Sequence, residues 1–305
     1  MKSCRRFPFN TIEPDGHTFT QLWFDDLHSA QPQRLLELKE GDSLSSGRYL
    51  IVNKICTGGL AKIYRGFDTI ENMEVAIKEI VLPTGGGAQI RQKSFARAKS
   101  EAALLAKFDH PGIVKLKDNF VEDHRAYLIL EHAEGKTLRA LIRDHGRLPW
   151  IDVCRIGIEI CLILDYLHGL ELPVIHRDLT PDNLICDSQL RIKLLDFNVA
   201  KQQDGLSSKT VVGKQSYMAP EQFRGQPAPQ SDLYSLGCTL YYLLVAVDPK
   251  PIAVSHPAEK NIELPQALDL IVARLTAANL NERYQTAAEV KIELEKLVEI
   301  FSSAR

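Results

Sequence analysis

Paired cysteines and long apolar runs are absent from this sequence, and their absence excludes several classes of protein. The six cysteines never form a Cys-x-x-Cys pair and none lies at metal-ligand spacing from a histidine, so we expect neither a zinc site nor a disulfide framework. No run of about 18 apolar residues occurs, and the chain does not start with a basic segment followed by an apolar one. We therefore expect a cytoplasmic chain without a membrane span, while a span in a longer parent protein stays an alternative.

The sequence also has almost no net charge. Lys and Arg number 37 against 39 Asp and Glu, which gives a formal net charge of -2. This balance does not indicate a nucleic-acid partner or a membrane surface. With 45% hydrophobic and 25% charged residues over 305 positions, the composition is that of a globular protein with one large domain or two lobes.

Periodicity divides the chain into three parts. Residues 1–45 are irregular and contain aromatic residues at Phe19, Trp23 and Phe24, so we expect an extension that docks on the rest. Residues 46–133 contain short alternating segments at 49–55, 61–67, 74–80, 113–120 and 125–132, which predict antiparallel strands, with one helix over 94–108 after a flexible connection at 84–88. Helical periodicity prevails from Thr137 to the end, most clearly at 151–167, 233–245, 268–277 and 287–301. A β lobe is thus expected to precede an α lobe.

Three cysteines lie within these helical patterns. Cys154 and Cys161 share one apolar segment and Cys238 lies in another. Since free cysteine packs as a small hydrophobe, we expect all three to be core residues.

The segments around the third strand carry groups that could hold phosphates. Gly58 and Gly59 lie in a turn between two predicted strands, where glycine lets backbone N–H groups approach phosphate oxygens; an ordinary hairpin is the alternative. Lys78 ends the sequence Val75-Ala-Ile-Lys on the next strand, and Glu101 lies on the following helix. A strand lysine steered by a carboxylate suits phosphate binding, whereas a surface lysine is the alternative.

The most specific stretch is Val174-Ile-His-Arg-Asp-Leu-Thr-Pro-Asp-Asn, followed by Leu194-Leu-Asp-Phe-Asn. Asp178 can orient and deprotonate an acceptor hydroxyl, and Asn183 and Asp196 supply hard oxygen ligands for Mg2+. Together the residues meet the needs of γ-phosphoryl transfer.

With Met218-Ala-Pro-Glu, Asp232-Leu-Tyr-Ser-Leu-Gly and Asn281-Glu-Arg-Tyr in the same order, the chain resembles a bacterial-type (Hanks-type) Ser/Thr protein kinase over about 47–300. The resemblance implies the α+β, two-lobed protein-kinase fold: an N-lobe (46–133) of antiparallel sheet plus one helix, and a mainly α-helical C-lobe (134–301). It also implies transfer of the γ-phosphoryl of ATP, with Mg2+ or alternatively Mn2+, to Ser/Thr hydroxyls of proteins. The partners implied are protein substrates and, for autophosphorylation, a second copy of the chain.

The resemblance assigns roles to single residues. Lys78 would bind the α- and β-phosphates and would pair with Glu101. Asp178 would be the catalytic base, and Asn183 and Asp196 would bind Mg2+. The nucleotide site implied in this way also contains Ile55, Gly58, Gly59, Ile63, Ala76, Leu130, Glu131, Ala133 and Ile185. The scaffold implied is a stack of Leu105, Leu116, His176 and Phe197 anchored by Asp232, and an ion pair between Glu221 and Arg283.

The sequence departs from the family pattern in the glycines and in the γ-phosphate clamp. Cys56 and Ala61 replace two glycines of the phosphate loop, and Asn198, which tolerates positive φ, replaces the glycine after Asp-Phe. Thr180 stands where the family has lysine and Lys214 where it has threonine. We infer an exchange, in which the Lys214 ammonium lies near Asp178 and the γ-phosphate while Thr180 takes the hydroxyl role.

Three alternatives and one regulatory prediction accompany this interpretation. If Thr180 and Lys214 are instead independent losses of the family's lysine and threonine, the chain would be a nucleotide-binding pseudokinase scaffold with weak or no phosphoryl transfer. A small-molecule kinase is disfavoured by the protein-substrate segment at 213–221, and a tyrosine kinase by the sequence Leu-Thr-Pro-Asp-Asn after Asp178. Ser207, Ser208 and Thr210 are candidate autophosphorylation sites whose phosphate could pair with Arg177.

Overall fold

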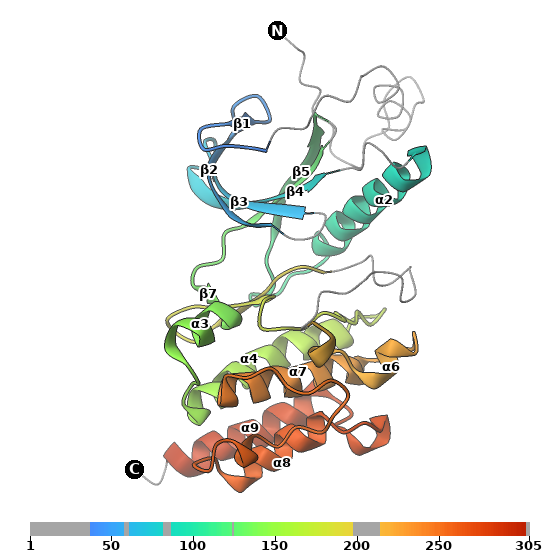
Figure 1. Cartoon of the computed structure of the whole chain (residues 1–305). Coiled ribbons are helices and arrows are strands. Elements are labelled where there is room, and N and C mark those ends of the chain that lie inside the picture. Colours follow the sequence, from blue (N-terminus) through green and yellow to red (C-terminus); the bar gives the residue numbers. More distant parts are fainter. Residues whose placement is uncertain (1–36, 58–60, 82–86, 124, 198–213, 303–305) are drawn as a thin grey trace. The chain divides into compact units, whose positions relative to one another are not determined.

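The computed structural model describes residues 37–57, 61–81, 87–123, 125–197 and 214–302 (Figure 1). The chain divides into two compact units. The first, the sheet unit, contains Met1–Asp109 and Val114–Ala133. The second, the helical unit, contains His110–Ile113 and Glu134–Arg305.

The sheet unit is built on six antiparallel strands in the order β1-β2-β3-β4-β6-β5. The strands are β1 (Ser43–Leu44), β2 (Tyr49–Thr57), β3 (Ala61–Asp68), β4 (Met73–Val81), β5 (Leu116–Glu122) and β6 (Arg125–Glu131). Alternation of β-branched and polar residues in these segments matches the two-residue period of a strand. The five predicted strands are therefore present, and the antiparallel sheet expected of the N-lobe is confirmed. β1 was not predicted, since it lies in the segment expected to be irregular.

One predicted strand boundary was wrong. β5 begins at Leu116 rather than at 113. Ile113 instead forms an isolated parallel bridge with Leu194, and the Leu194 N–H donates to Gly112 O at 2.7 Å. Residues 110–113 therefore belong to the helical unit. The local apolar pattern cannot reveal the pairing of Ile113 with Leu194.

One face of the sheet carries the core of this unit. Val75 and Ile77 of β4 pack there with six other buried hydrophobic residues from the strands and with Leu44 of β1. Leu38 packs against the same cluster, so the segment just before β1 covers this face. The aromatic residues of the predicted extension, at 19, 23 and 24, lie outside the described residues.

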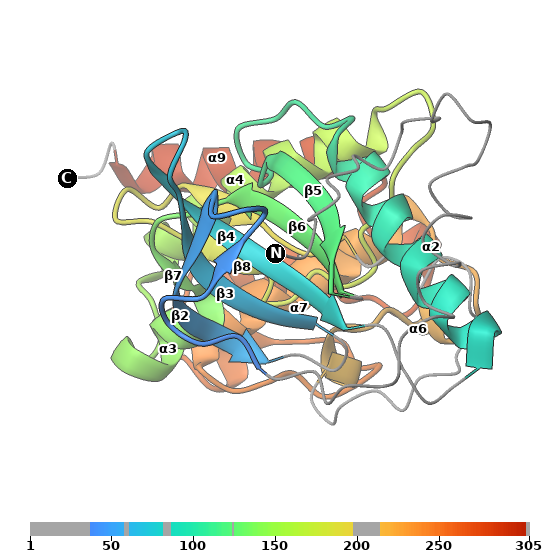
Figure 2. The same cartoon turned by 90° about the horizontal axis from the view of Figure 1, so that it is seen from above.

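Helix α2 (Gly87–Leu105) lies beside β5 and β6 (Figure 2). It begins at Gly87 rather than at 94, because residues 87–93 are mostly polar and carry no apolar stripe for a periodicity argument to detect. The predicted helix is confirmed, and the apolar residues at helical spacing within 94–108 form its buried face, with at most 4% of their surface exposed: Phe95, Ala98, Ala102 and Leu105.

The helical unit stacks long helices around α7 (Figure 1). Its helices are α3 (Leu138–His145), α4 (Trp150–His168), α6 (Pro220–Phe223), α7 (Pro229–Val245), α8 (Gln266–Leu275) and α9 (Ala287–Ser302). Three short strands accompany them, β7 (Lys136–Thr137), β8 (Leu184–Cys186) and β9 (Ile192–Leu194), with 3-10 turns η1 (Lys214–Tyr217), η2 (Pro257–Glu259) and η3 (Leu280–Glu282). Every residue of α7 from 231 to 244 is buried, so this helix is the core of the unit.

The cysteines of this unit have the predicted core role. Cys154, Cys161 and Cys238 have no exposed surface. Burial raises the pKa of the Cys154 thiol to about 12, because the thiolate would lose its hydration. These thiols are therefore packing residues.

A buried ion pair ties α6 to the segment before α9. Arg283 donates to Glu221 at 2.7 Å (Nη1–Oε1) and 2.9 Å (Nη2–Oε2), and its side chain has no exposed surface. Ser231 donates to the same carboxylate at 2.6 Å. Burial alone would raise the pKa of Glu221, but the hydrogen bonds from Arg283 and Ser231 outweigh it and hold the pKa below its usual value.

We predict that Arg283→Met destabilises the protein by about 3 kcal/mol, because it leaves the Glu221 carboxylate buried without its partner. Urea unfolding followed by circular dichroism measures the effect. The double variant Arg283→Met/Glu221→Leu should recover most of the loss, since it removes both charges. Equal stability of Arg283→Met and wild type would contradict a structural role for the pair.

Candidate active site

Lys78 and Glu101 meet within the sheet unit. Lys78 lies on β4 and Glu101 on α2, and Nζ and Oε1 are 2.7 Å apart. Their side chains are 10% and 11% exposed. Because side chains alternate along a strand, Lys78 projects from the face opposite to that of Val75 and Ile77, toward α2. The predicted pair is therefore formed.

Apolar residues surround the lysine on the same face of the sheet. Ile63 of β3 is directly opposite Lys78 in the register, and Ala76 of β4 is opposite Leu130 of β6. Leu130 is 8% exposed, while Ile63 and Ala76 are partly exposed. Three of the predicted nucleotide-contacting residues thus form an apolar surface next to a buried cation, which is the composition of a small-molecule site.

The other predicted nucleotide residues are placed less completely. Ile55 lies near the end of β2 with 51% of its surface exposed, and Gly58 and Gly59 lie outside the described residues. Glu131 ends β6, where its N–H donates to Lys115 O at 2.8 Å. Ala133 follows as the last residue of the sheet unit, and Ile185 lies on β8 of the helical unit.

Asp178 and Asn183 are joined in the loop between α4 and β8. Asn183 Nδ2 donates to the backbone oxygen of Asp178 at 2.7 Å and to its Oδ2 at 3.2 Å. The two residues are 4% and 6% exposed. This hydrogen bonding uses the amide N–H groups of Asn183, so its Oδ1 remains as the acceptor that a cation could bind.

The segment that carries Asp196 is connected to this loop by backbone hydrogen bonds. Leu195 N–H donates to Asn183 O at 2.9 Å, and His176 Nε2 lies 3.1 Å from Leu195 O. The rings of His176 and Phe197 meet edge to face, 5.0 Å apart. Asp196 has φ +48°, a left-handed conformation that is strained for a residue other than glycine and that clusters at functional sites. Asn198, where we expected such a conformation, lies outside the described residues.

The buried carboxylate of Asp232 on α7 holds the loop that carries Asp178. Asp232 has no exposed surface and accepts from the backbone N–H groups of His176 at 2.8 Å and Arg177 at 2.9 Å. His168 Nε2, at the end of α4, lies 3.0 Å from the same carboxylate. These bonds compensate the positive φ of Arg177, which is +65°. Asp232 therefore holds the backbone of the two residues that directly precede Asp178.

Of the two exchanged residues, Thr180 and Lys214, the structure describes the side chain of Thr180 only. Thr180 is 2% exposed, and its Oγ1 has no hydrogen-bond partner among the described residues. Lys214 opens η1, but its side chain lies outside the part that the structure describes. The proposed exchange thus stays a prediction.

The two predicted metal ligands fit Mg2+ by their chemistry. No group of three or more His, Cys, Asp or Glu side chains that could hold a metal ion occurs among the described residues. Asn183 and Asp196 supply one amide and one carboxylate oxygen, and Mg2+ is usually held by few protein oxygens together with waters and substrate phosphates.

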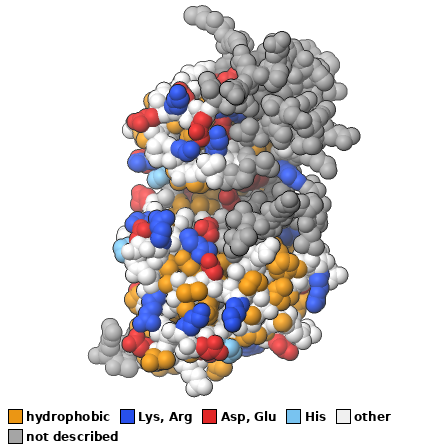
Figure 3. Space-filling view, in the orientation of Figure 1, with side chains coloured by type: hydrophobic (Ala, Val, Ile, Leu, Met, Phe, Trp, Pro, Cys, Tyr) orange, Lys and Arg blue, Asp and Glu red, His pale blue; other side chains and the backbone are white. Residues whose placement is uncertain are grey.

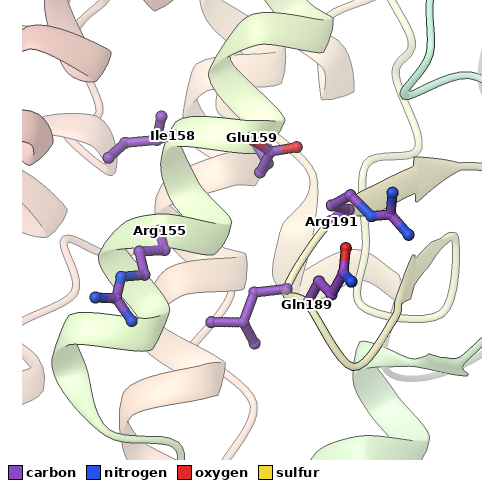
Figure 4. A pocket seen from close by; sticks show the side chains of 6 residues that line it. Arg155, Ile158, Glu159, Gln189 and Arg191 are labelled. Carbon is purple, nitrogen blue, oxygen red and sulfur yellow. The ribbon is translucent and has the colours of Figure 1, made fainter.

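A pocket elsewhere in the helical unit contains none of these residues. It lies between α4 and the β8–β9 turn (Figure 4), encloses about 240 Å³, and is lined by Arg155, Ile158, Glu159, Gln189, Leu190 and Arg191. Its charges are mixed, and basic and acidic side chains are likewise interspersed on the face of the molecule in Figure 3.

Every helix of the described ranges is too short or too polar to cross a bilayer.

His168 and a group of residues around Arg139 were not predicted from the sequence. His168 occurs 64 positions before Asp232, and Arg139 contacts Asp248 across 109 positions. A histidine that ends an apolar helix was a weak signal for the first contact. For the second the sequence offered none, because a contact between distant exposed residues leaves no periodicity.

The arrangement agrees with three comparisons with known proteins. Residues 49–305 match the family model "Protein kinase domain". The serine/threonine-protein kinase PrkC of Bacillus subtilis is 32% identical over 269 residues (82% of this chain, 40% of the relative), and the probable serine/threonine-protein kinase PknB of Lactococcus lactis is 33% identical over 261 residues (80% and 41%). The chain thus spans about two fifths of the length of these relatives.

Solved structures agree on the fold. A structure titled "PpkA-294 apo form" superposes with a TM-score of 0.73 at 26% identity and covers 85% of this chain and 99% of its own. The kinase domain of Mycobacterium tuberculosis PknI has a TM-score of 0.66 at 22% identity, with coverage of 85% and 99%. The two-lobed kinase fold predicted from the sequence is confirmed, and the chain belongs to the protein kinase domain family.

Proposed function

We propose that this chain is a protein kinase domain that transfers the γ-phosphoryl of ATP to Ser or Thr hydroxyls of proteins. The observation that carries the proposal is the buried Lys78–Glu101 ion pair at 2.7 Å. Desolvation makes a buried ion pair weak in stabilising a fold, whereas phosphoryl transfer requires a cation held rigidly beside the phosphates. The names of the relatives support Ser and Thr as acceptors.

Residues of each unit have separate roles in the proposed reaction. Lys78, oriented by Glu101, binds phosphate oxygens, and the apolar surface of Ile63, Ala76 and Leu130 receives the base of the nucleotide. Asp178, held by Asn183 and the Asp232-bound loop, accepts the proton of the substrate hydroxyl. Asn183 and Asp196 would hold Mg2+, which neutralises phosphate charge when bound.

We predict that Asp178→Ala lowers phosphoryl transfer by about 10²- to 10⁴-fold, because it removes the general base. Incorporation of labelled phosphate from ATP and Mg2+ into a generic Ser/Thr protein measures the effect. Asp109→Ala is a matched control, since that aspartate side chain is 93% exposed. A wild-type protein that binds ATP but incorporates no label would instead support the pseudokinase alternative.

The exchange of Thr180 and Lys214 extends this proposal. A buried hydroxyl without a hydrogen bond costs about 1–3 kcal/mol, so the Thr180 Oγ1 should have a partner beyond the described residues. Lys214 is the residue we propose, because an ammonium between Thr180, Asp178 and the γ-phosphate would satisfy the hydroxyl and neutralise the phosphate.

We predict that Lys214→Ala lowers kcat by about 10²-fold, the size expected for a lost electrostatic contact in a transition state. The double variant Thr180→Lys/Lys214→Thr restores the usual family arrangement and should be more active than either single variant. Steady-state kinetics with saturating ATP measures both. Wild-type turnover in Lys214→Ala would show that the lysine has no part in the clamp.

We also predict autophosphorylation at Ser207, Ser208 or Thr210, which lie outside the described residues between Asp196 and Glu221. Phosphate there could pair with Arg177 and order the segment. Mass spectrometry after incubation with ATP and Mg2+ should detect phosphate on peptide 200–216 of the wild type and none on Asp178→Ala. Mixing active protein with tagged Asp178→Ala tests transfer between two copies, and an unmodified wild-type peptide would argue against this regulation.

A further inference from the structure

Arg139 of α3 is the centre of a charged cluster beside the catalytic loop. Its Nη1 lies 2.6 Å from Asp248 Oδ1, and its Nε and Nη2 each lie 3.4 Å from Asp182 Oδ2. The guanidinium lies over the ring of Tyr242, 4.2 Å from its centroid, and Nη2 is 3.3 Å from the Tyr217 hydroxyl. One cation is thus shared by two carboxylates and bounded by two aromatic rings.

The cluster joins the two segments that the proposed reaction uses. Asp182 immediately precedes Asn183 in the loop of Asp178, and the Arg139 N–H donates to Pro181 O at 3.1 Å. Tyr217 ends η1, the turn that Lys214 opens in the segment expected to hold protein substrates. All these contacts lie within the helical unit.

The carboxylates of the cluster are accessible to a ligand. The side chains of Asp182 and Asp248 are 47% and 43% exposed, whereas that of Arg139 is 27% exposed. Two carboxylates this close together attract a cation, and a fork-shaped guanidinium suits them better than an ammonium. Arg139 already occupies that position.

We infer, on the basis of the proposed kinase function, that Arg139 determines substrate specificity by filling an anionic subsite that Asp182 and Asp248 would otherwise offer to a basic side chain of the substrate. The wild-type enzyme accordingly gains nothing from an arginine near the acceptor hydroxyl. Removal of the Arg139 guanidinium exposes the subsite and creates a preference for arginine.

The cluster should persist without Arg139. Tyr217 donates to Asp248 at 2.5 Å, and Ser235 donates to Tyr217 O at 2.8 Å. Burial, together with the bond to Asp248, raises the pKa of Tyr217 far above its usual value, so its hydroxyl remains a donor at all working pH values. Asp248 therefore keeps one partner and its place in Arg139→Gln.

The test compares Arg139→Gln with the matched control Arg143→Gln. Arg143 lies one turn further along α3, is 73% exposed and pairs with the adjacent Asp144. Peptides with one Ser acceptor in a neutral background carry a single arginine or alanine at each neighbouring position. We expect kcat/KM for the best arginine peptide, relative to its alanine counterpart, to rise about fivefold in Arg139→Gln, through KM, as an exposed ion pair allows. Wild type and Arg143→Gln should show ratios near one.

Two further measurements separate specificity from folding and from catalysis. Fluorescence anisotropy of the same labelled peptides gives Kd without phosphoryl transfer, and the arginine gain should shrink at high salt. The double variant Arg139→Gln/Asp248→Asn should lose most of the gain, while Arg139→Met, which removes the charge and keeps most of the length of the side chain, serves if Arg139→Gln melts below wild type.

The inference is overturned if a folded Arg139 variant binds the arginine and alanine peptides in the wild-type ratio, or if wild type already prefers arginine to the same degree. Failure of the proposed function would be a different result. In that case no peptide is phosphorylated by wild type, and the anisotropy ratios still decide whether Arg139 fills the subsite.

Discussion

The hydrogen bonds of the buried Asp232 carboxylate hold the loop on which the candidate residues of the helical unit depend. The carboxylate has no exposed surface, and it accepts from the backbone N–H groups of His176 and Arg177 and pairs with His168. A buried charge is tolerated where it is fully hydrogen-bonded, and here the donors are the loop that leads into Asp178. Because α7 is buried from 231 to 244, the loop is anchored to the core helix of its unit.

Strand alternation places the candidate residues of the sheet unit. β4 sends Ile77 into the core of the sheet unit and Lys78 to the opposite face, where Glu101 meets it. Glu79 returns to the core side and pairs there with Arg125 and Tyr64. One strand therefore supplies both a functional charge and a structural charge, and a shift of one residue in register would exchange their environments.

Much of this could be predicted from the sequence. The period of two predicted the strands, and the period of 3.6 predicted the helices α2 and α4. The departures were at polar helix ends and at single bridges, such as the start of α2 at Gly87 and the pairing of Ile113 with Leu194. The first segment carries no apolar stripe, and the partner of Ile113 lies far away in the sequence, so local pattern could not find either feature.

The sequence by itself determined the fold family and the candidate residues for the chemistry, because the motifs name Lys78, Asp178, Asn183 and Asp196, which lie on a strand and in two loops. The tertiary structure alone decided which charges meet. Arg139 finds Asp248 across 109 positions and Arg283 finds Glu221 across 62. Periodicity tells which face of an element a side chain occupies, but the partner on that face depends on how the chain returns, and only the packed fold supplies that information.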